Sequence, residues 1–331
     1  MSDSPVPIID ISGYRSGALA DKLRVAHAID EACRAIGFLV VSGHGVPEAA
    51  VERADRATRA FFDLPLASKS RYAPGASGAY RGYHALESNA IAYSLDDRAA
   101  PPDLLERYSM GRVEIDPADP YYSRNEMARS AFAPNVWPTE LPDFAPAMID
   151  YYRAMERLAL DLMRLFALAL GLDEHWFDDK VDKHMTHLVV QNYPDQETPP
   201  RPGQLRCGAH SDYGSMTILK TENKPGGLEV RAADGQWKPV QAVPGAFIVN
   251  LGDLMAQWTN DRWVSTMHRV VNPPRDKIAG TRRQSLIFFH QPNYDAAIEC
   301  LPNCLDGGRA KYKPTTSGEH LYMKMTKQIV A

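Results

Sequence analysis

The second half of the chain alternates short apolar segments with turn-forming residues, and this pattern narrows the choice of fold more than any other feature. After residue 185 the apolar segments are too short for typical helices. Turn signals separate them at 223–227, 233–235, 243–245, 259–261 and 272–274. Many short strands at such spacing are typical of an all-β sandwich or barrel. The sequence therefore predicts a β-rich core over residues 185–300.

The first half predicts helices and two buried strands. Apolar residues recur at helical spacing in three segments, and the longest of these ends at Gly171. The expected helices are 19–36, about 48–62 and 144–170, and the expected strands are 6–10 and 38–42. Residues 73–140 are rich in Gly, Pro, Ser and Tyr and lack a clear period. We expect a long irregular insert or lid there.

Composition limits which binding partners and which cellular compartment are expected. The chain has 331 residues, 44% of them hydrophobic and 24% charged, with a net charge of -4, as in ordinary globular proteins. It has no basic stripe with interleaved aromatics, so no nucleic acid partner is expected. We see neither a signal peptide nor an apolar run long enough to cross a membrane. Four cysteines are too few for a disulfide framework, which favours reduced thiols in the cytoplasm.

Three residues form a candidate set of metal ligands. His210 and Asp212 are two positions apart, so both side chains point the same way on an extended segment. His268 follows much later, in a segment that could lie on another strand. Two imidazoles and one carboxylate form a facial triad that leaves the other face of an octahedral iron open. The pattern indicates a non-heme Fe(II) oxygenase.

A second set of polar residues could bind a carboxylate. Arg283 and Ser285 share one face of a predicted strand, and a guanidinium with a hydroxyl beside it is a good carboxylate receptor. Upstream, Gln191 and Tyr193 share one face of another predicted strand and offer further polar contacts.

Ordered motifs across most of the chain resemble one known family. The matching segments are VPIID at 6–10, GFLVVSGHGVP at 37–47, FFDLP at 61–65, PGGLEV at 225–230, PGAFIVNLGD at 244–253 and HRVVNP at 268–273. In this order they resemble the isopenicillin-N-synthase-like branch of the 2-oxoglutarate and Fe(II)-dependent dioxygenases. The interval between His268 and Arg283 is longer than the plant members usually show, and 275–281 is expected to form a hairpin loop there.

The resemblance implies a fold and a division of the chain. The fold would be mainly β with flanking helices (α+β), built on a double-stranded β-helix, or jelly-roll, core with a helical N-terminal region. Residues 1–125 would form the N-terminal region with its lid, and 126–184 a helical support. Residues 185–300 would form the Fe(II) and 2-oxoglutarate core, and 301–331 a C-terminal cap.

The resemblance also implies a reaction. The metal set would hold Fe(II), and 2-oxoglutarate and O2 would bind there and generate a ferryl species. That species would hydroxylate, desaturate or cyclise a small molecule, in specialised (secondary) metabolism. The implied contacts to 2-oxoglutarate are Arg283, Ser285, Tyr193 and, as a weaker candidate, Gln191.

Aromatic residues near the motifs are candidates for the substrate pocket. Tyr213 directly follows the Asp212 ligand, and Phe289 ends the strand of Arg283. Tyr83 and Tyr294 could also line the pocket, and residues 322–325 could cap it.

Other functions remain open on the sequence alone. An oxidase or cyclase that needs no 2-oxoglutarate would use Arg283 and Ser285 for a carboxylate of its own substrate. A non-catalytic binding protein and a zinc hydrolase on the same ligands are further alternatives. The sequence identifies neither the primary substrate nor the oligomeric state.

Overall fold

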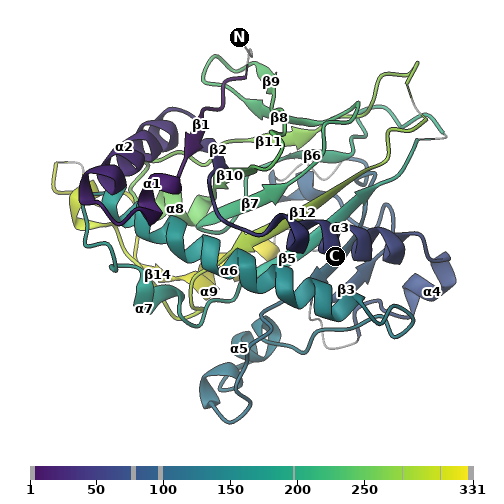
Figure 1. Ribbon diagram of the computed structural model, residues 1–331, viewed down its shortest axis with the longest axis horizontal. Helices are drawn as coiled ribbons and strands as arrows, with labels where there is room; N and C mark the ends of the chain where they lie inside the picture. The colour runs from purple at the N-terminus through teal and green to yellow at the C-terminus, as the bar shows by residue number, and fades with distance from the viewer. Residues whose placement is uncertain are drawn as a thin grey trace.

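The molecule is built on two main β-sheets (Figure 1). The computed structural model describes residues 4–75, 80–95, 100–196, 198–277, 279–305 and 307–326. The larger sheet has the order β1 (Ile8–Asp10), β2 (Phe38–Ser42), β10 (Phe247–Leu251), β7 (Met216–Lys220), β12 (Arg283–His290), β5 (His187–Tyr193), β4 (Glu106–Met110) and β3 (Gly82–His84). The smaller sheet has the order β6 (Cys207–His210), β11 (His268–Val270), β8 (Leu228–Arg231) and β9 (Trp237–Pro239). A short pair, β13 (Ala297–Ile298) and β14 (Thr315–Thr316), lies near the C-terminus.

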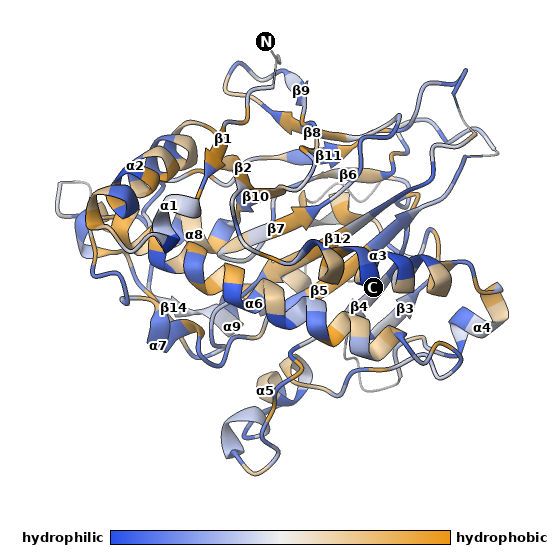
Figure 2. Ribbon diagram, viewed as in Figure 1, coloured by the Kyte–Doolittle hydropathy of each residue, from blue (hydrophilic) through white to orange (hydrophobic). Residues whose placement is uncertain are grey.

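Helices cover the outer face of the larger sheet. The longest, α6 (Phe144–Ala169), runs across it and packs against α2 (Leu19–Ala35) and α3 (Glu48–Phe62) (Figure 1). In Figure 2, α6 alternates between hydrophobic and hydrophilic residues, as expected of a helix that buries one stripe. The remaining helices are α1 (Ser12–Arg15), α4 (Leu66–Ser70), α5 (Glu126–Ala131), α7 (Asp178–Val181), α8 (Asp253–Trp258) and α9 (Ser317–Thr326), with 3-10 turns at Ile91–Leu95, Pro120–Tyr122 and Pro302–Cys304. Among the described helices, none combines the length and apolar character needed to cross a bilayer.

The two faces of the larger sheet have different roles. On β12, Leu286 and Phe288 pack into the core beneath the helices. Arg283, Ser285 and Ile287 alternate with them and face the smaller sheet, where they line a cavity. Because side chains alternate along a strand, one face of the sheet closes the core and the other builds a site.

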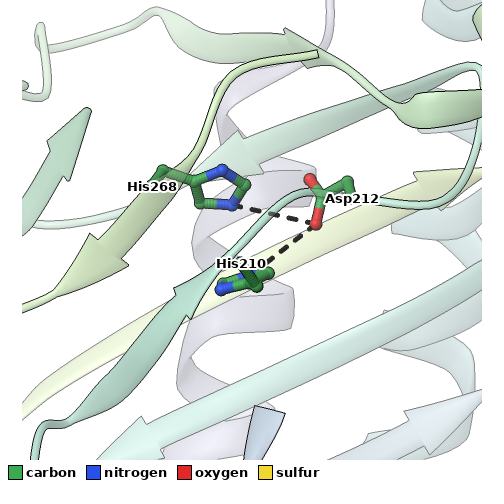
Figure 3. Close-up of side chains that lie close together, drawn as sticks. All are labelled: His210, Asp212 and His268. Carbon is green, nitrogen blue, oxygen red and sulfur yellow. Dashed lines mark ion pairs between the residues drawn. The ribbon is translucent and has the colours of Figure 1, made fainter. Parts of the chain in front are cut away.

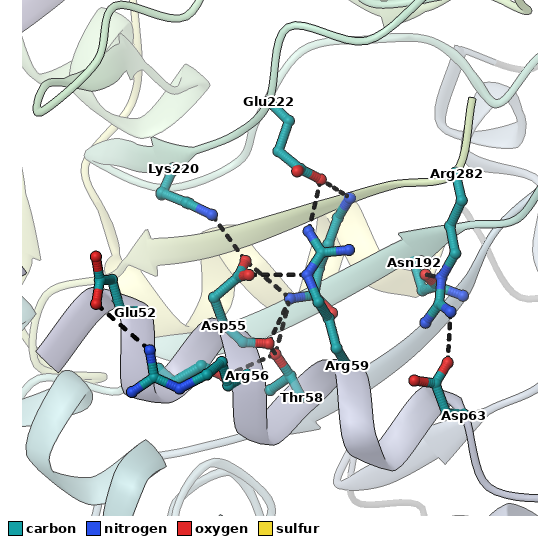
Figure 4. Close-up of polar contacts among 12 residues, drawn as sticks. Glu52, Asp55, Arg56, Thr58, Arg59, Asp63, Asn192, Lys220, Glu222 and Arg282 are labelled. Carbon is teal, nitrogen blue, oxygen red and sulfur yellow. Dashed lines mark hydrogen bonds and ion pairs between the residues drawn. The ribbon is translucent and has the colours of Figure 1, made fainter. Parts of the chain in front are cut away.

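Polar contacts to α3 fix the register of β12. Gln284 donates from Nε2 to Thr58 Oγ1 (2.9 Å) and to Asp55 Oδ1 (3.1 Å) on the helix side. Figure 4 shows the surrounding network, in which Arg282 reaches Asp63 and Asn192. A slip of one residue would turn every side chain to the opposite face, so these contacts keep Arg283 directed inward.

The expected mainly β jelly-roll core with flanking helices is confirmed, and α2, α3 and α6 lie where helices were predicted. The region 73–140, predicted as a long irregular insert or lid, contains two strands, because β3 and β4 join the larger sheet there. Strand β4 is only five residues long and carries Glu106, Arg107 and Ser109, which obscure its apolar alternation. The N-terminal segment therefore shares one sheet with the segment expected to form the core.

Candidate metal centre

The structure brings the three predicted ligands together in one buried cluster (Figure 3). His210 ends β6, Asp212 follows it, and His268 begins β11 directly opposite His210 in the antiparallel register. Asp212 Oδ1 lies 3.7 Å from His210 Nε2 and 3.8 Å from His268 Nε2. An ion about 2 Å from each donor can bridge atoms up to about 4 Å apart, so these distances suit a single metal.

Hydrogen bonds orient each ligand toward that point. His210 Nδ1 lies 2.8 Å from the carbonyl oxygen of Gly208, and His268 Nδ1 lies 3.1 Å from that of Thr266. A carbonyl can only accept, so each Nδ1 carries a proton and Nε2 is the ring nitrogen that can bind a metal. Asn250 donates to Asp212 Oδ2 (2.7 Å), which leaves Oδ1 for a metal. Such supporting contacts set tautomer and orientation in metal sites.

The charge state also suits a divalent cation. Burial lowers the pKa of the His210 imidazole to about 4, and His268 adds to the effect. Burial opposes ionisation of Asp212, but the two imidazoles and the Asn250 hydrogen bond outweigh it and lower the pKa of its carboxyl. At neutral pH the cluster therefore offers His210 as a neutral nitrogen donor and Asp212 as an anionic oxygen donor. This donor set fits Fe(II).

A cavity beside the ligands, here called the inner chamber, lies between the two sheets. Arg283, Ser285, Gln191 and Tyr193 all line it, together with the metal ligands. Arg283 is 2% exposed and donates to Thr221 Oγ1 and to the carbonyl oxygen of Gly226 (3.3 Å). Its Nε has no hydrogen-bond partner, and no described carboxylate forms an ion pair with it. A buried cation without a counter-ion is costly, so the chamber is suited to an anionic ligand.

A second buried arginine, which sequence reasoning missed, supports the first. Arg206 donates to the carbonyl oxygens of Pro225 (3.0 Å) and Thr281 (2.9 Å). Burial, together with the charge of Arg283, lowers the pKa of Arg206 to about 10. The centre of the Tyr193 ring lies 5.5 Å from the guanidinium carbon of Arg283 and 6.0 Å from that of Arg206. Arg283 and Tyr193 line the inner chamber, and the buried charge of Arg206 lies close to both of them.

A wider cavity, here called the outer chamber, shares His210 and Asp212 with the inner chamber. It has a volume of about 140 Å³, and Tyr213 and Phe289 are among the residues that line it. Gln191 lines both chambers. Residues that sequence reasoning had not assigned to the wall are Tyr80, Asn89, Asp103, Leu105 and Arg107.

Two aromatic residues expected in the pocket lie elsewhere. Tyr83 is 2% exposed on the helix side of β3, where its hydroxyl donates to Glu106 (2.6 Å). Tyr294 packs against Phe132 and Tyr121 in a separate cluster. Neither lines the outer chamber. Tyr83 lies on the face of β3 that points to the core, and Tyr294 is packed in its own aromatic cluster.

The C-terminal helix α9 covers the outer chamber. Its Leu321 and Met325 line the cavity, whereas Tyr322 and Met323, two residues of the expected cap, are largely exposed. Lys324 donates to Asp253 Oδ2 (2.5 Å). Asp253 also accepts from Ser211 (3.2 Å), between the first two ligands, and from Ser265 (2.7 Å), shortly before His268. Asp253 therefore links the cap to both ligand-bearing segments.

Comparisons with known proteins agree with this geometry. The family model described as "non-haem dioxygenase in morphine synthesis N-terminal" matches residues 6–140, and the model of the "2OG-Fe(II) oxygenase superfamily" matches residues 185–292. A 2-oxoglutarate-Fe(II) type oxidoreductase of Emericella nidulans is 34% identical over 96% of this chain and 88% of its own length. The validamycin A dioxygenase of Streptomyces hygroscopicus is 32% identical over 92% of this chain and 81% of its own length. A full-length Neurospora crassa protein, crystallised in complex with alpha-KG and thymine, superimposes with a TM-score of 0.82 and 31% identity, covering 97% of this chain and 96% of that one.

Proposed function

We propose that this chain, which belongs to the 2OG-Fe(II) oxygenase superfamily, holds Fe(II) on His210, Asp212 and His268 and oxidises a small molecule in the outer chamber. When bound, iron with 2-oxoglutarate and O2 supplies the oxidising chemistry, and the protein supplies position and exclusion of water. One observation carries the assignment of 2-oxoglutarate to the inner chamber. Arg283, a buried cation without a described carboxylate partner, lines that chamber together with the three ligands.

The residues around the ligands have separate roles in this proposal. Arg283 and Ser285 bind the distal carboxylate of 2-oxoglutarate, and the charge of Arg206 strengthens their attraction for it. Thr221 Oγ1 accepts from Arg283 and lies 2.9 Å from Ser285 Oγ, so it holds both anchors in place before the ligand arrives. Tyr193, 1% exposed, presents its ring to Arg283 and excludes water. Such preorganisation reduces the entropy lost on binding.

The outer chamber is the substrate site in this proposal. It adjoins His210 and Asp212 and is walled on one side by Tyr213 and Phe289. The named relatives act on or bind small molecules, validamycin A and thymine among them, which supports a small molecule here too. We infer hydroxylation, desaturation or ring closure in specialised metabolism. The four cysteines are free thiols, which supports the expected cytoplasmic setting.

Turnover of 2-oxoglutarate tests the proposed function. Purified protein would be supplied with Fe(II), 2-oxoglutarate and air, and succinate would be quantified. We expect iron-dependent succinate formation that is lost in Asp212→Ala and retained in Asp234→Ala, a change in an exposed turn. Iron-dependent O2 consumption without any need for 2-oxoglutarate would instead favour the oxidase or cyclase alternative.

A further inference from the structure

We propose that the substrate of the outer chamber carries a carboxylate, and that Arg107 binds it. The inference rests on the proposed function, because it takes this chamber as the substrate site. Arg107 lies on β4 opposite Gln191 of β5 in the antiparallel register. It lines the outer chamber with His210 and Asp212, so a group bound to it lies in the same cavity as the metal ligands.

Arg107 retains hydrogen-bond donors for a ligand. Its Nη2 donates to the hydroxyl of Tyr80, and its guanidinium carbon lies 4.6 Å from the centre of that ring. Its Nε is buried without a partner. Within the described ranges no carboxylate forms an ion pair with Arg107. A guanidinium carries five N–H donors in a planar fork that matches a carboxylate, so a phenol partner leaves much of this capacity unused.

The carboxylate on the same wall is already engaged by the backbone. Asp103 Oδ1 accepts from the Gly208 amide (2.7 Å) and Oδ2 accepts from the Ile91 amide (2.8 Å). These contacts tie the 3-10 turn at Ile91–Leu95 to β6. Burial raises the pKa of Asp103, whereas these two hydrogen bonds and the nearby charges of His210 and Arg107 act in the opposite direction.

A neutral histidine also lines the chamber. His187 lines the chamber, and its Nε2 lies 3.3 Å from Nη1 of buried Arg81. Burial and the charge of Arg81 lower the pKa of His187 to about 3, so the ring is neutral at physiological pH. A guanidinium can only donate, so Nε2 accepts and the proton resides on Nδ1. Apart from the metal ligands, the chamber lining therefore holds Arg107, a neutral histidine and one carboxylate whose two oxygens already accept from the backbone, which leaves Arg107 as the group suited to an anionic acceptor.

The remainder of the chamber fits a hydrocarbon body. Its apolar lining consists of Ile91, Leu105, Val189, Phe289, Leu321 and Met325. A substrate held at Arg107 by its carboxylate would place its apolar part against these side chains and near the metal ligands. The carbon presented for oxidation would then be remote from the carboxylate.

Matched acids and amides test the inference directly. The probes are phenylacetate, cyclohexylacetate and 4-phenylbutyrate, each paired with its neutral primary amide. Binding would be measured by anaerobic equilibrium dialysis against protein loaded with Fe(II) and saturating 2-oxoglutarate, which keeps the probes out of the inner chamber. We expect at least one acid to bind more than about tenfold tighter than its amide, as charge-assisted hydrogen bonds allow.

Variants assign that preference to one residue. In Arg107→Gln the affinities for acid and amide should differ by no more than about twofold, and Arg107→Lys should retain part of the preference for the acid. Arg153→Gln is the control, because Arg153 is exposed and paired with Glu114, and it should retain the whole preference. The inference is overturned if no acid is preferred in the wild type, or if the preference persists in Arg107→Gln. If Arg107→Gln does not fold, Arg107→Met takes its place, and a preference that persists in that variant overturns the inference.

A further variant separates this failure from failure of the proposed function. If 2-oxoglutarate does not bind the wild type, the proposed function fails, and the acids are dialysed against the iron-free protein instead. An acid that then loses affinity in Arg283→Met but not in Arg107→Gln occupies the inner chamber, which also overturns the role of Arg107. Loss in Arg107→Gln alone would support the carboxylate site independently of 2-oxoglutarate.

Discussion

Replacement of Arg283 by methionine should weaken 2-oxoglutarate binding without destabilising the ligand-free protein. Arg283 is 2% exposed and has no carboxylate partner among the described residues, and burial lowers the pKa of its guanidinium. Methionine occupies a similar volume without the charge. Replacing buried ionic groups with apolar ones of similar volume is often neutral or stabilising by about 1–4 kcal/mol. We therefore expect the free energy of unfolding without ligand to stay constant or rise by up to about 2 kcal/mol.

The ligand-bound protein should respond in the opposite direction. Loss of the charge-assisted contacts should cost about 3 kcal/mol of binding free energy, or about 100-fold in Kd. At a 2-oxoglutarate concentration of 100 times the wild-type Kd, the wild type gains about 2.7 kcal/mol of stability. The same concentration only equals the Kd of Arg283→Met, so the variant should gain about 0.4 kcal/mol.

Anaerobic unfolding in denaturant, with Fe(II) and with or without 2-oxoglutarate, measures both effects. Arg282→Met is the matched control, since this neighbouring arginine points to the opposite face of β12 and contacts Asp63 and Asn192 (Figure 4). It should keep the full ligand-induced gain. The reasoning is refuted if Arg283→Met keeps that gain, or if it unfolds more than about 2 kcal/mol more easily without ligand.

Three further changes have distinct expected outcomes. Asn250→Ala removes the hydrogen bond that orients Asp212 and should weaken Fe(II) binding at least about tenfold in a metal-competition titration; unchanged affinity would contradict this role. Lys324→Met releases the α9 cap from Asp253 and should raise the KM for any substrate more than the Kd for 2-oxoglutarate, whereas equal effects would argue against a cap. Burial opposes ionisation of Asp30, but hydrogen bonds from Trp263 and Arg262 outweigh it and lower the pKa of its carboxyl. The ionised Asp30 carboxylate therefore stabilises the fold above the unfolded-state pKa of about 3.9, and this stabilisation is lost as pH falls through the lower folded-state pKa. Asp30→Asn should accordingly be less stable than the wild type at pH 5–8, and the difference should shrink below about pH 4. Urea unfolding at several pH values measures this difference, and a constant gap down to pH 3 would contradict it.

The local part of the metal centre could be predicted from the sequence, because the spacing of His210 and Asp212 already fixes their relative direction on an extended segment. The position of His268 depends on the pairing of β11 with β6, which is a tertiary contact. No local sequence pattern predicts that pairing, so His268 could be predicted as the third ligand only from the motif around it. The Arg283 and Ser285 pair was similarly local, since both lie on one face of β12.

The substrate pocket was predicted less well because its wall depends on strand phase and long-range packing. Tyr83 and Tyr80 are three positions apart, and the polar insert around them gives no clear alternation to show which one faces inward. Arg107 and Arg206 are single basic residues, and such residues usually lie on the surface. The inward placement of Arg107 and the burial of Arg206 arise from sheet closure, which composition does not encode.

Anaerobic titration of the Fe(II)-loaded protein with 2-oxoglutarate tests most directly whether the metal centre and the inner chamber form one site. The observable is the visible metal-to-ligand charge-transfer band of the iron–2-oxoglutarate complex. We expect a saturable band in the wild type, no band in His268→Ala, and a band in Arg283→Met that needs about 100-fold more 2-oxoglutarate. An iron-loaded wild type that shows no band at any 2-oxoglutarate concentration would contradict the proposed site.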